Sequence, residues 1–462
     1  MTKAIKVLFA TSEIRPLVSA GGLGEAASGL VAALRAAGAD VTVALPDYQS
    51  WPLTSPSELA LDVPDWAAPS LARVGEHPSV GKVAFFSVPG IERPDPYVDE
   101  HGQGWPDNTN RFAAFAAAVA AYATTAGFDV VHLNDWHTAL APAFLAPDQP
   151  TVLTIHNLGH QGGADHTWAD RLPAHRDAYL WGDGINSLAG AIRAAWMVTT
   201  VSPTYVAEIL TEADGMGLHT RLAERTSDLV GIRNGIDVRT WDPATDEYTP
   251  NFSSDQLDGK LAARQELLNH IGWDDSGEPI VAMITRLVEQ KGVDLAFQAA
   301  QYLEGMRARM VVLGSGDRRL ADWARWLHGE LPDRFWFYDG YDVPLSHRLF
   351  GGSDVLLMPS QFEPCGLAQM QAMAYGTIPV VTAVGGLADT VVDADAFSDG
   401  NGFVALSNDE SGIVDALHRS LRAVRHAGRR KAIQGRGMDH DWSWAEPAQR
   451  YFDVYREVLA RK

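Results

Sequence analysis

Short apolar runs alternate with longer segments in which apolar residues recur at helical spacing. In the first half of the chain the runs at 6–12, 41–45, 83–88, 130–133 and 152–155 predict strands, and segments 24–37 and 111–126 predict helices. Strands that are apolar at nearly every position are typical of a parallel sheet covered by helices on both faces. The pattern therefore predicts a doubly wound α/β domain.

A polar stretch at 241–258 interrupts this alternation, which then restarts. The second half predicts strands at 279–284, 309–313, 334–338, 354–358 and 378–382, and helices at 292–303, 319–328, 345–351 and 366–374. We therefore expect two Rossmann-like domains, residues 1–245 and 246–440. A last segment, 441–462, carries a helix over 444–460 and is expected to pack back on the N-terminal domain.

Composition narrows the class of protein. A chain of 462 residues suits two domains better than one core. Its net charge of −21 disfavours nucleic acid and an anionic membrane surface as partners. The single cysteine excludes an internal disulfide. The first apolar run ends in Ser-Glu-Ile-Arg, without a small-residue cleavage site, so we interpret it as a strand and expect a cytoplasmic enzyme.

The loop after the first predicted strand holds Gly21 and Gly22 just before a predicted helix. Adjacent glycines let backbone N–H groups approach a phosphate, and the start of a helix adds positive potential. A tight turn without a ligand explains the same residues equally simply. By itself this loop is a weak sign of phosphate binding.

The second domain offers two further strand ends with chemistry. Arg286 and Lys291 lie between a strand and a helix, where they could clamp a diphosphate or form a solvated charge pair. Glu363 stands at another strand end, followed by Cys365 and Gly366. It could accept hydrogen bonds from sugar hydroxyls, or simply favour the start of a helix. Only seven lysines occur in the chain, which makes Lys291 conspicuous.

Histidines and an aspartate follow two strands of the first domain, in Asn134-Asp135-Trp136-His137 and in His156-Asn157-Leu158-Gly159-His160. Their spacing does not match that of ligands in known zinc sites, so we expect no metal.

The order of these segments along the chain is more informative than any one segment alone. The whole chain resembles the glycogen/starch synthase family through SEIRPLVSAGGLGE, RPDPYVDEHGQGWPDNTNRF, NDWHTAL, TIHNLGHQG, TVSPTYVAEI, IRNGIDVRTWDP, ITRLVEQKGVDL, GYDVPLSHRLFGGSDVLLMPSQFEPCGLAQMQAMAYG and VGGLADTV. The resemblance implies the GT-B fold, with two doubly wound domains and the active site in a cleft between them. It also implies transfer of a sugar from a nucleotide-diphosphate donor to an α-glucan-like acceptor with retention of configuration, and no cofactor beyond that donor.

Site residues follow from the same resemblance. It implies that Glu363, His156, Arg286 and Lys291 are catalytic, and that the donor is bound by Gly21, Gly22, Asn157, Tyr341, Cys365, Gly366 and Leu367. Glu13, Tyr97, Asp135 and His137 are implied to face the acceptor.

Two positions depart from the family pattern. Ser19 stands where the family has lysine before Gly-Gly-Leu, and Gln361 stands where it usually has arginine before Phe-Glu-Pro-Cys-Gly. Both changes remove positive charge near the expected leaving group. This leaves two alternatives to a glucan synthase: a pseudoglycosyltransferase that couples a nucleotide-activated cyclitol to an amino-sugar oligosaccharide, and a non-catalytic glucan-binding protein.

Overall fold

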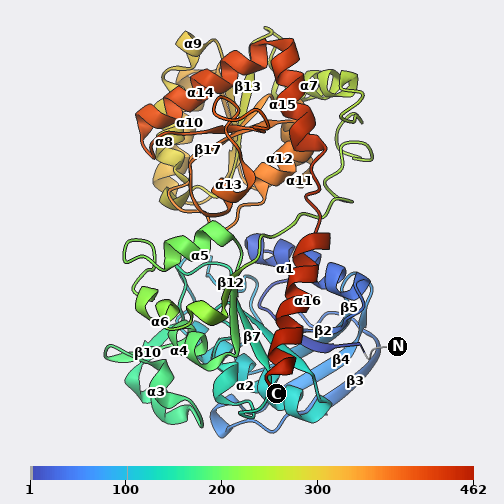
Figure 1. Ribbon diagram of the computed structural model, residues 1–462, viewed down its shortest axis with the longest axis vertical. Coiled ribbons are helices and arrows are strands. Elements are labelled where there is room, and N and C mark those ends of the chain that lie inside the picture. Colours follow the sequence, from blue (N-terminus) through green and yellow to red (C-terminus); the bar gives the residue numbers. More distant parts are fainter. Residues whose placement is uncertain (1–3, 101) are drawn as a thin grey trace. The chain divides into compact units, whose positions relative to one another are not determined.

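The computed structural model describes residues 4–100 and 102–462 (Figure 1). Contacts divide the chain into two compact units. Unit 1 comprises Met1–Gly235 and Trp444–Lys462, and unit 2 comprises Ile236–Ser443. The chain therefore leaves unit 1 once and returns to it with its last helix. Each unit is built on its own sheet.

Unit 1 has, among its described residues, a nine-stranded sheet of order β12-β11-β7-β6-β1-β2-β5-β4-β3. Neighbouring strands from β12 to β5 are parallel, and β4 and β3 extend the sheet as antiparallel strands. The strands are β1 (Lys6–Ala10), β2 (Asp40–Pro46), β3 (Thr54–Ala60), β4 (Leu71–His77), β5 (Gly81–Ser87), β6 (Val130–Asn134), β7 (Thr151–Ile155), β11 (Met197–Thr200) and β12 (Leu229–Gly231).

Three long helices pack in unit 1: α1 (Gly22–Ala36), α2 (Asn108–Ala126) and α16 (Ala445–Ala460). Although α16 is the last helix of the chain, it lies against α1 and β7 (Figure 1). The indole of Trp444 fills the space beside Gly29, where a Cβ would overlap it. Tyr455 Oη shares a 2.7 Å hydrogen bond with Nδ1 of the buried His132 on β6. The C-terminal helix is therefore part of the core of unit 1.

Smaller elements complete unit 1. They form a three-stranded antiparallel sheet, four short helices and four segments of 3₁₀-helix. In chain order they are η1 (Asp65–Ala67), η2 (Ala141–Ala143), β8 (Gly163–Asp165), η3 (His166–Arg171), α3 (Arg176–Tyr179), β9 (Leu180–Trp181), β10 (Gly184–Asn186), α4 (Ser187–Ala194), α5 (Pro203–Ile209), α6 (His219–Ala223) and η4 (Thr226–Asp228).

Unit 2 is built on a six-stranded parallel sheet of order β15-β14-β13-β16-β17-β18. The strands are β13 (Ile280–Ile284), β14 (Arg309–Gly314), β15 (Phe335–Asp339), β16 (Val355–Met358), β17 (Ile378–Val381) and β18 (Phe403–Val404). The helical segments are α7 (Asp258–Ile271), η5 (Glu289–Lys291), α8 (Val293–Ala300), α9 (Leu303–Met306), α10 (Arg318–Glu330), α11 (Val343–Gly352), α12 (Ala368–Ala374), α13 (Gly385–Thr390), α14 (Glu410–Arg425) and α15 (Ala427–Met438).

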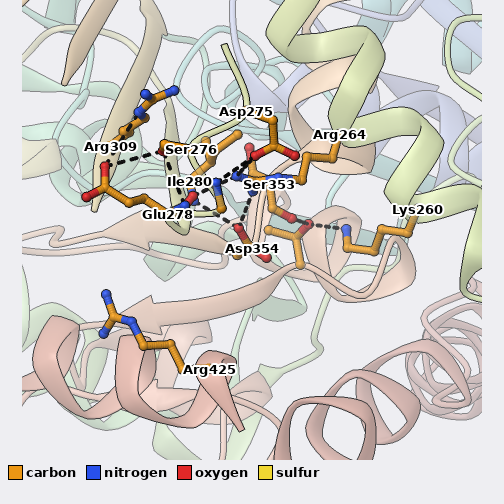
Figure 2. Close-up of polar contacts among 12 residues, drawn as sticks. Lys260, Arg264, Asp275, Ser276, Glu278, Ile280, Arg309, Ser353, Asp354 and Arg425 are labelled. Atoms are coloured by element: carbon orange, nitrogen blue, oxygen red, sulfur yellow. Dashed lines mark hydrogen bonds and ion pairs between the residues drawn. The ribbon is translucent and has the colours of Figure 1, made fainter. Parts of the chain in front are cut away.

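Polar contacts fix α7 to the amino ends of β13 and β16 (Figure 2). Arg264 on α7 donates to Asp354 Oδ2 at 2.8 Å and to the carbonyl of Glu278 at 2.6 Å. The same Asp354 oxygen accepts the backbone N–H of Ile280 at 2.9 Å. These contacts lie at the amino ends of the two strands, away from the loops that follow their carboxyl ends.

The polar stretch after unit 1 packs on unit 2. The Trp241 indole stacks on the His347 ring with centroids 4.1 Å apart, and His347 Nδ1 lies 2.8 Å from Asp246 Oδ2. Tyr375 also donates to Asp246. Aromatic stacking and a buried hydrogen-bond network explain why the contact-based boundary falls at Gly235, before a stretch that composition alone suggests is a linker.

The structure contains elements that the apolar pattern does not predict. Strands β3 and β4 carry mostly exposed or partly exposed residues, so they lack a buried run. Helix α14 does have the helical pattern, with buried Ile413, Ala416, Leu417, Leu421 and Val424 behind the N-cap Asp409. This segment lies outside the helices predicted from the sequence, although its apolar residues recur at helical spacing.

Candidate active site

The strand orders define one switch point in each sheet. In unit 1 the chain proceeds from β1 to β2 in one direction and places β6 on the other side of β1. In unit 2 it proceeds from β13 to β14 and β15, and places β16 on the other side of β13. Loops after adjacent strands diverge at such a point and leave a crevice at the carboxyl ends. The candidate residues of each unit gather there.

At the switch point of unit 1, the carboxylate of Glu13 ties together three segments. Oε2 accepts the backbone N–H groups of Ala20 and Gly21 at 2.7 and 3.0 Å, and Oε1 accepts the hydroxyl of Tyr97 at 2.7 Å. Only 3% of Glu13 is exposed. Burial raises the pKa of the Glu13 carboxyl, whereas these donors oppose the rise.

Asp135 stands directly after β6 with a left-handed backbone, φ 55°. Its Oδ1 accepts the N–H groups of His156 and Asn157 at 2.7 and 3.4 Å, which joins the loops after β6 and β7. Burial raises the pKa of the Asp135 carboxyl to about 7, and the nearby charge of Glu13 acts in the same direction. Asp135 therefore changes its ionisation near neutral pH.

Two histidines of this cluster are neutral; His137 is buried and His156 is partly buried. His137 stacks on the Tyr97 ring with centroids 4.9 Å apart, and burial holds its pKa well below the usual range. His156 Nε2 lies 2.9 Å from Asn134 Oδ1, and burial lowers the pKa of His156 to about 3. Neither ring therefore carries positive charge at neutral pH. The His156 ring is hydrogen-bonded, whereas the buried Nδ1 of His137 has no hydrogen-bond partner among the described residues.

The glycine loop begins α1 without a side-chain cap. Gly21 is the N-cap residue and Gly22 the first helical residue, and a Cβ at either position would meet no atom within 4 Å. Because Glu13 already accepts the N–H of Gly21, a phosphate at this helix end would face the N–H groups that follow it. The loop is thus open, but the N–H groups of Ala20 and Gly21 are already used by Glu13.

In unit 2 the cations lie after β13 and the carboxylate after β16. Lys291 forms a direct ion pair with Glu363, of which only 5% is exposed, and Ser360 Oγ lies 3.3 Å from Glu363 Oε2. Arg286 is exposed, and within the described part of the chain its guanidinium has no hydrogen bond or ion pair. The site therefore holds one paired and one unpaired cation.

Glycines allow these loops to meet. Gly292, with φ 60°, lies so close to the carbonyl of Pro359 that a Cβ would overlap it. The N–H of Gly386 donates to the carbonyl of Glu363 at 3.1 Å, and a Cβ there would overlap the Cys365 carbonyl. The close approach brings the Lys291 and Glu363 loops together.

The remaining residues that are predicted to bind the donor follow β15 or β16. Cys365 is buried, Gly366 has a left-handed backbone with φ 69°, and Leu367 is the N-cap of α12. Tyr341 is 68% exposed, just before α11. Gln361 is exposed, and its backbone N–H binds the Gln290 carbonyl at 2.8 Å.

The structure also adds residues that the motifs did not single out. Ser12 Oγ lies 2.7 Å from Tyr97 Oη, and Tyr48 donates to the Ser12 carbonyl at 3.1 Å. Asn134 donates to the Ala10 carbonyl at 2.9 Å and so links β6 to β1. Their signal in the sequence is a polar side chain at or just beyond the end of an apolar strand.

No group of His, Cys, Asp and Glu side chains within 4–100 and 102–462 is arranged to hold a metal ion. In the same residues no helix is both long and apolar enough to span a membrane.

The chain is similar to known glycosyltransferases. The model of the starch synthase catalytic domain matches residues 6–224, and that of glycosyl transferases group 1 matches residues 269–432. Glycogen synthase from Thioalkalivibrio sulfidiphilus is 37% identical over 484 residues, covering 99% of this chain and 100% of the relative. Glycogen synthase from Anaeromyxobacter sp. is 39% identical over 485 residues, covering 99% and 100%.

Solved structures agree. The catalytic domain of starch synthase IV from Arabidopsis thaliana, bound to ADP and acarbose, superimposes with a TM-score of 0.89 at 30% identity, covering 99% of this chain and 100% of that one. Sucrose-phosphate synthase from Thermosynechococcus elongatus shares the fold, with a TM-score of 0.64 at 19% identity.

The fold and the two strand-end sites define a GT-B glycosyltransferase. The chain belongs to the glycogen/starch synthase family. These comparisons give no support to the cyclitol-coupling and non-catalytic alternatives.

Proposed function

We propose that this glycosyltransferase moves a glucosyl group from a nucleoside-diphosphate glucose to the end of an α-glucan, with retention of the anomeric configuration. The observation that carries the proposal is the group formed by Arg286, Lys291 and Glu363 at the switch point of unit 2. An exposed guanidinium in the same loop as the lysine of a partly buried ion pair suits a ligand that carries both phosphate charge and sugar hydroxyls. The starch synthase IV structure, which holds ADP, supports the donor class.

The leaving group sets the first requirement of the reaction. As the bond between the sugar and the diphosphate breaks, negative charge grows on the phosphate oxygens. Arg286 meets it with a fork of donors and Lys291 with a point charge. Glu363 keeps Lys291 in place, and its carboxylate oxygens can accept sugar hydroxyls that replace Ser360. The charge of the phosphate is thereby balanced by side chains.

The acceptor requires a different environment. The hydroxyl that attacks must lose its proton as the new glycosidic bond forms. We assign the acceptor side to Glu13, Tyr97, Asp135 and His137, which lie together at the switch point of unit 1. His156 and Asn157 belong to the same loops and are assigned to the transferred sugar. Since no carboxylate is singled out as a covalent nucleophile, we propose front-face attack through an oxocarbenium-like state, with the departing phosphate taking the proton.

Nucleotide binding tests the donor assignment. We expect one of ADP, UDP, GDP and dTDP to raise the melting temperature of the wild type, because a ligand that binds only the folded state stabilises it. Arg286→Ala should lose most of that rise. Arg318→Ala is the matched control, since this side chain is 95% exposed on α10. Four nucleotides without effect on the wild type, or an unchanged rise in Arg286→Ala, would contradict the assignment.

A further inference from the structure

A pocket in unit 1 has no part in the reaction described above. It has a volume of about 190 Å³ and is formed by the three loops that follow β1, β2 and β5. Its lining includes Leu17, Ser19, Gln49, Arg93, Asp95 and Pro96. The volume exceeds what one ordered water needs and is smaller than the roughly 300 Å³ at which pockets for drug-sized ligands begin. A single ring fits this size better than a chain of rings.

The pocket adjoins the acceptor-side cluster. Ala20, which contributes to its wall, donates its N–H to Glu13 at 2.7 Å. Pro96 precedes Tyr97 in the chain, and Tyr48 connects the pocket wall to Ser12. A ligand that spans several rings can therefore occupy the pocket with one ring while another ring lies at Tyr97 and Glu13.

The lining offers hydrogen bonds that the protein leaves unused. Gln49 is exposed, and its side-chain amide has no hydrogen bond among the residues that the structure describes. Asp95 Oδ1 accepts the N–H groups of Tyr97 and Val98 at 2.8 and 2.9 Å, but within that same part of the chain no hydrogen bond uses Oδ2. Leu17 and Pro96 supply apolar walls. Hydroxyl-binding groups beside apolar walls match a sugar ring, which has both polar edges and C–H faces.

The charges disfavour an anion. The one cation of the lining, Arg93, already donates to Asp107 at 2.8 Å and to the Glu92 carbonyl at 2.9 Å. Its guanidinium also lies over the Trp105 ring, 5.2 Å from the centroid. Asp95 adds negative charge, which helps to raise the pKa of Glu13. A phosphate would meet a neutralised arginine and a carboxylate, whereas a neutral ring meets neither penalty.

We propose that this pocket binds one sugar residue of the glucan acceptor, other than the residue that receives the transferred glucose. The proposal rests on the proposed function for the identity of the acceptor. Ser19 belongs to this wall, so the short side chain at this position keeps an acceptor subsite open. The departure from the family pattern at Ser19 is then a feature of acceptor recognition.

Acceptor kinetics with defined oligosaccharides test the subsite. The acceptors are maltose, maltotriose and maltotetraose, and the variants are Gln49→Ala, which removes a hydrogen-bonding group, and Ser19→Leu, which extends an apolar side chain into the pocket. We expect both to raise KM for the longer acceptors, by about three- to tenfold for Gln49→Ala, the effect of one lost hydrogen bond. For Gln49→Ala, which lies outside the glycine loop, kcat and the donor KM should stay unchanged. Gln256→Ala, at an exposed glutamine of unit 2, should behave as the wild type.

Calorimetry without donor separates this proposal from the proposed function. If the wild type binds maltotriose and both variants bind it more weakly, the subsite holds even if no glucose transfer is found. Unchanged maltotriose affinity and KM in both variants would overturn it. A rise confined to the donor KM would overturn it as well, since the pocket would then serve the donor. Competition between inorganic phosphate and maltotriose would overturn the assignment to a neutral ring.

Discussion

Arg286 and Lys291 have the same sign of charge but different surroundings. Arg286 is exposed and makes no ion pair among the described residues, whereas Lys291 neutralises a carboxylate that is 5% exposed. Removing Arg286 should remove only the proposed contact to the donor. Removing Lys291 also leaves a buried carboxylate without its partner, which is costly in a protein interior.

This difference predicts separate effects on activity and stability. Arg286→Ala should lower kcat/KM for the donor about ten- to a hundredfold, the effect of one charge-assisted hydrogen bond, with an unchanged melting temperature. Lys291→Ala should lower kcat/KM at least as much and also lower the melting temperature. Steady-state kinetics and thermal unfolding of both variants check this. Wild-type kinetics in either variant would remove the diphosphate assignment, and equal melting temperatures would contradict the structural role of the Lys291–Glu363 pair.

Asp135 gives the proposed acceptor site a pH dependence. Its pKa is about 7 in the folded protein and lower in the unfolded chain. Between about pH 4 and pH 7 the folded state therefore binds more protons, and the contribution of Asp135 to stability falls as pH rises. Asp135→Asn cannot ionise, so its melting temperature should rise relative to that of the wild type between pH 5 and pH 8. A constant difference over that range would contradict the raised pKa.

At the scale of elements, the C-terminal helix is held by a buried polar contact. Tyr455→Phe leaves Nδ1 of His132 without its 2.7 Å partner. We expect unit 1 to lose about 1–3 kcal/mol of stability, seen as a lower melting temperature. Tyr302→Phe removes a 2.9 Å contact to Glu410 at the surface and should cost much less. Equal losses in the two variants would show that α16 is not anchored through Tyr455.

Apolar runs predict most of the buried parallel strands, because these strands have no polar face to obscure the pattern. Apolar runs miss β12 and β18, which have only three and two residues, and β11, half of which is threonine. They fail for β3 and β4, whose exposed residues give no buried run, and for the stretch around Trp241, whose polar composition conceals a stacking contact with His347. They also carry no information on strand order. The switch points between β1 and β6 and between β13 and β16 follow from pairing, which a single sequence does not record.

Some of the site residues can be selected from the sequence, whereas the contacts between them cannot. Glu13, Asp135, Arg286 and Glu363 could be selected from the sequence, since each follows an apolar strand. The ion pair of Lys291 with Glu363 could not, because the partners are 72 residues apart. The pocket beside Ser19 could not either, because three loops far apart in the chain form it.

At the scale of the whole molecule, the net charge of the chain disfavours an anionic donor, and local cations must compensate for it. The chain carries a net charge of −21, so its overall field repels a nucleoside-diphosphate sugar. Binding of such a donor therefore depends on local cations, which the loop between β13 and α8 provides in Arg286 and Lys291. A neutral glucan meets no such repulsion. The cluster proposed to bind the acceptor can therefore contain carboxylates, namely those of Glu13 and Asp135.

Glucose transfer to maltotriose is the most direct test of the central claim. The purified full chain is incubated with ADP-, UDP- or GDP-glucose and maltotriose, and the products are followed by chromatography and by the proton NMR signal of the new anomeric centre. The account predicts maltotetraose and longer products from at least one donor, with the new linkage in the α configuration. Absence of elongation from all three donors, or a new linkage in the β configuration, would contradict it.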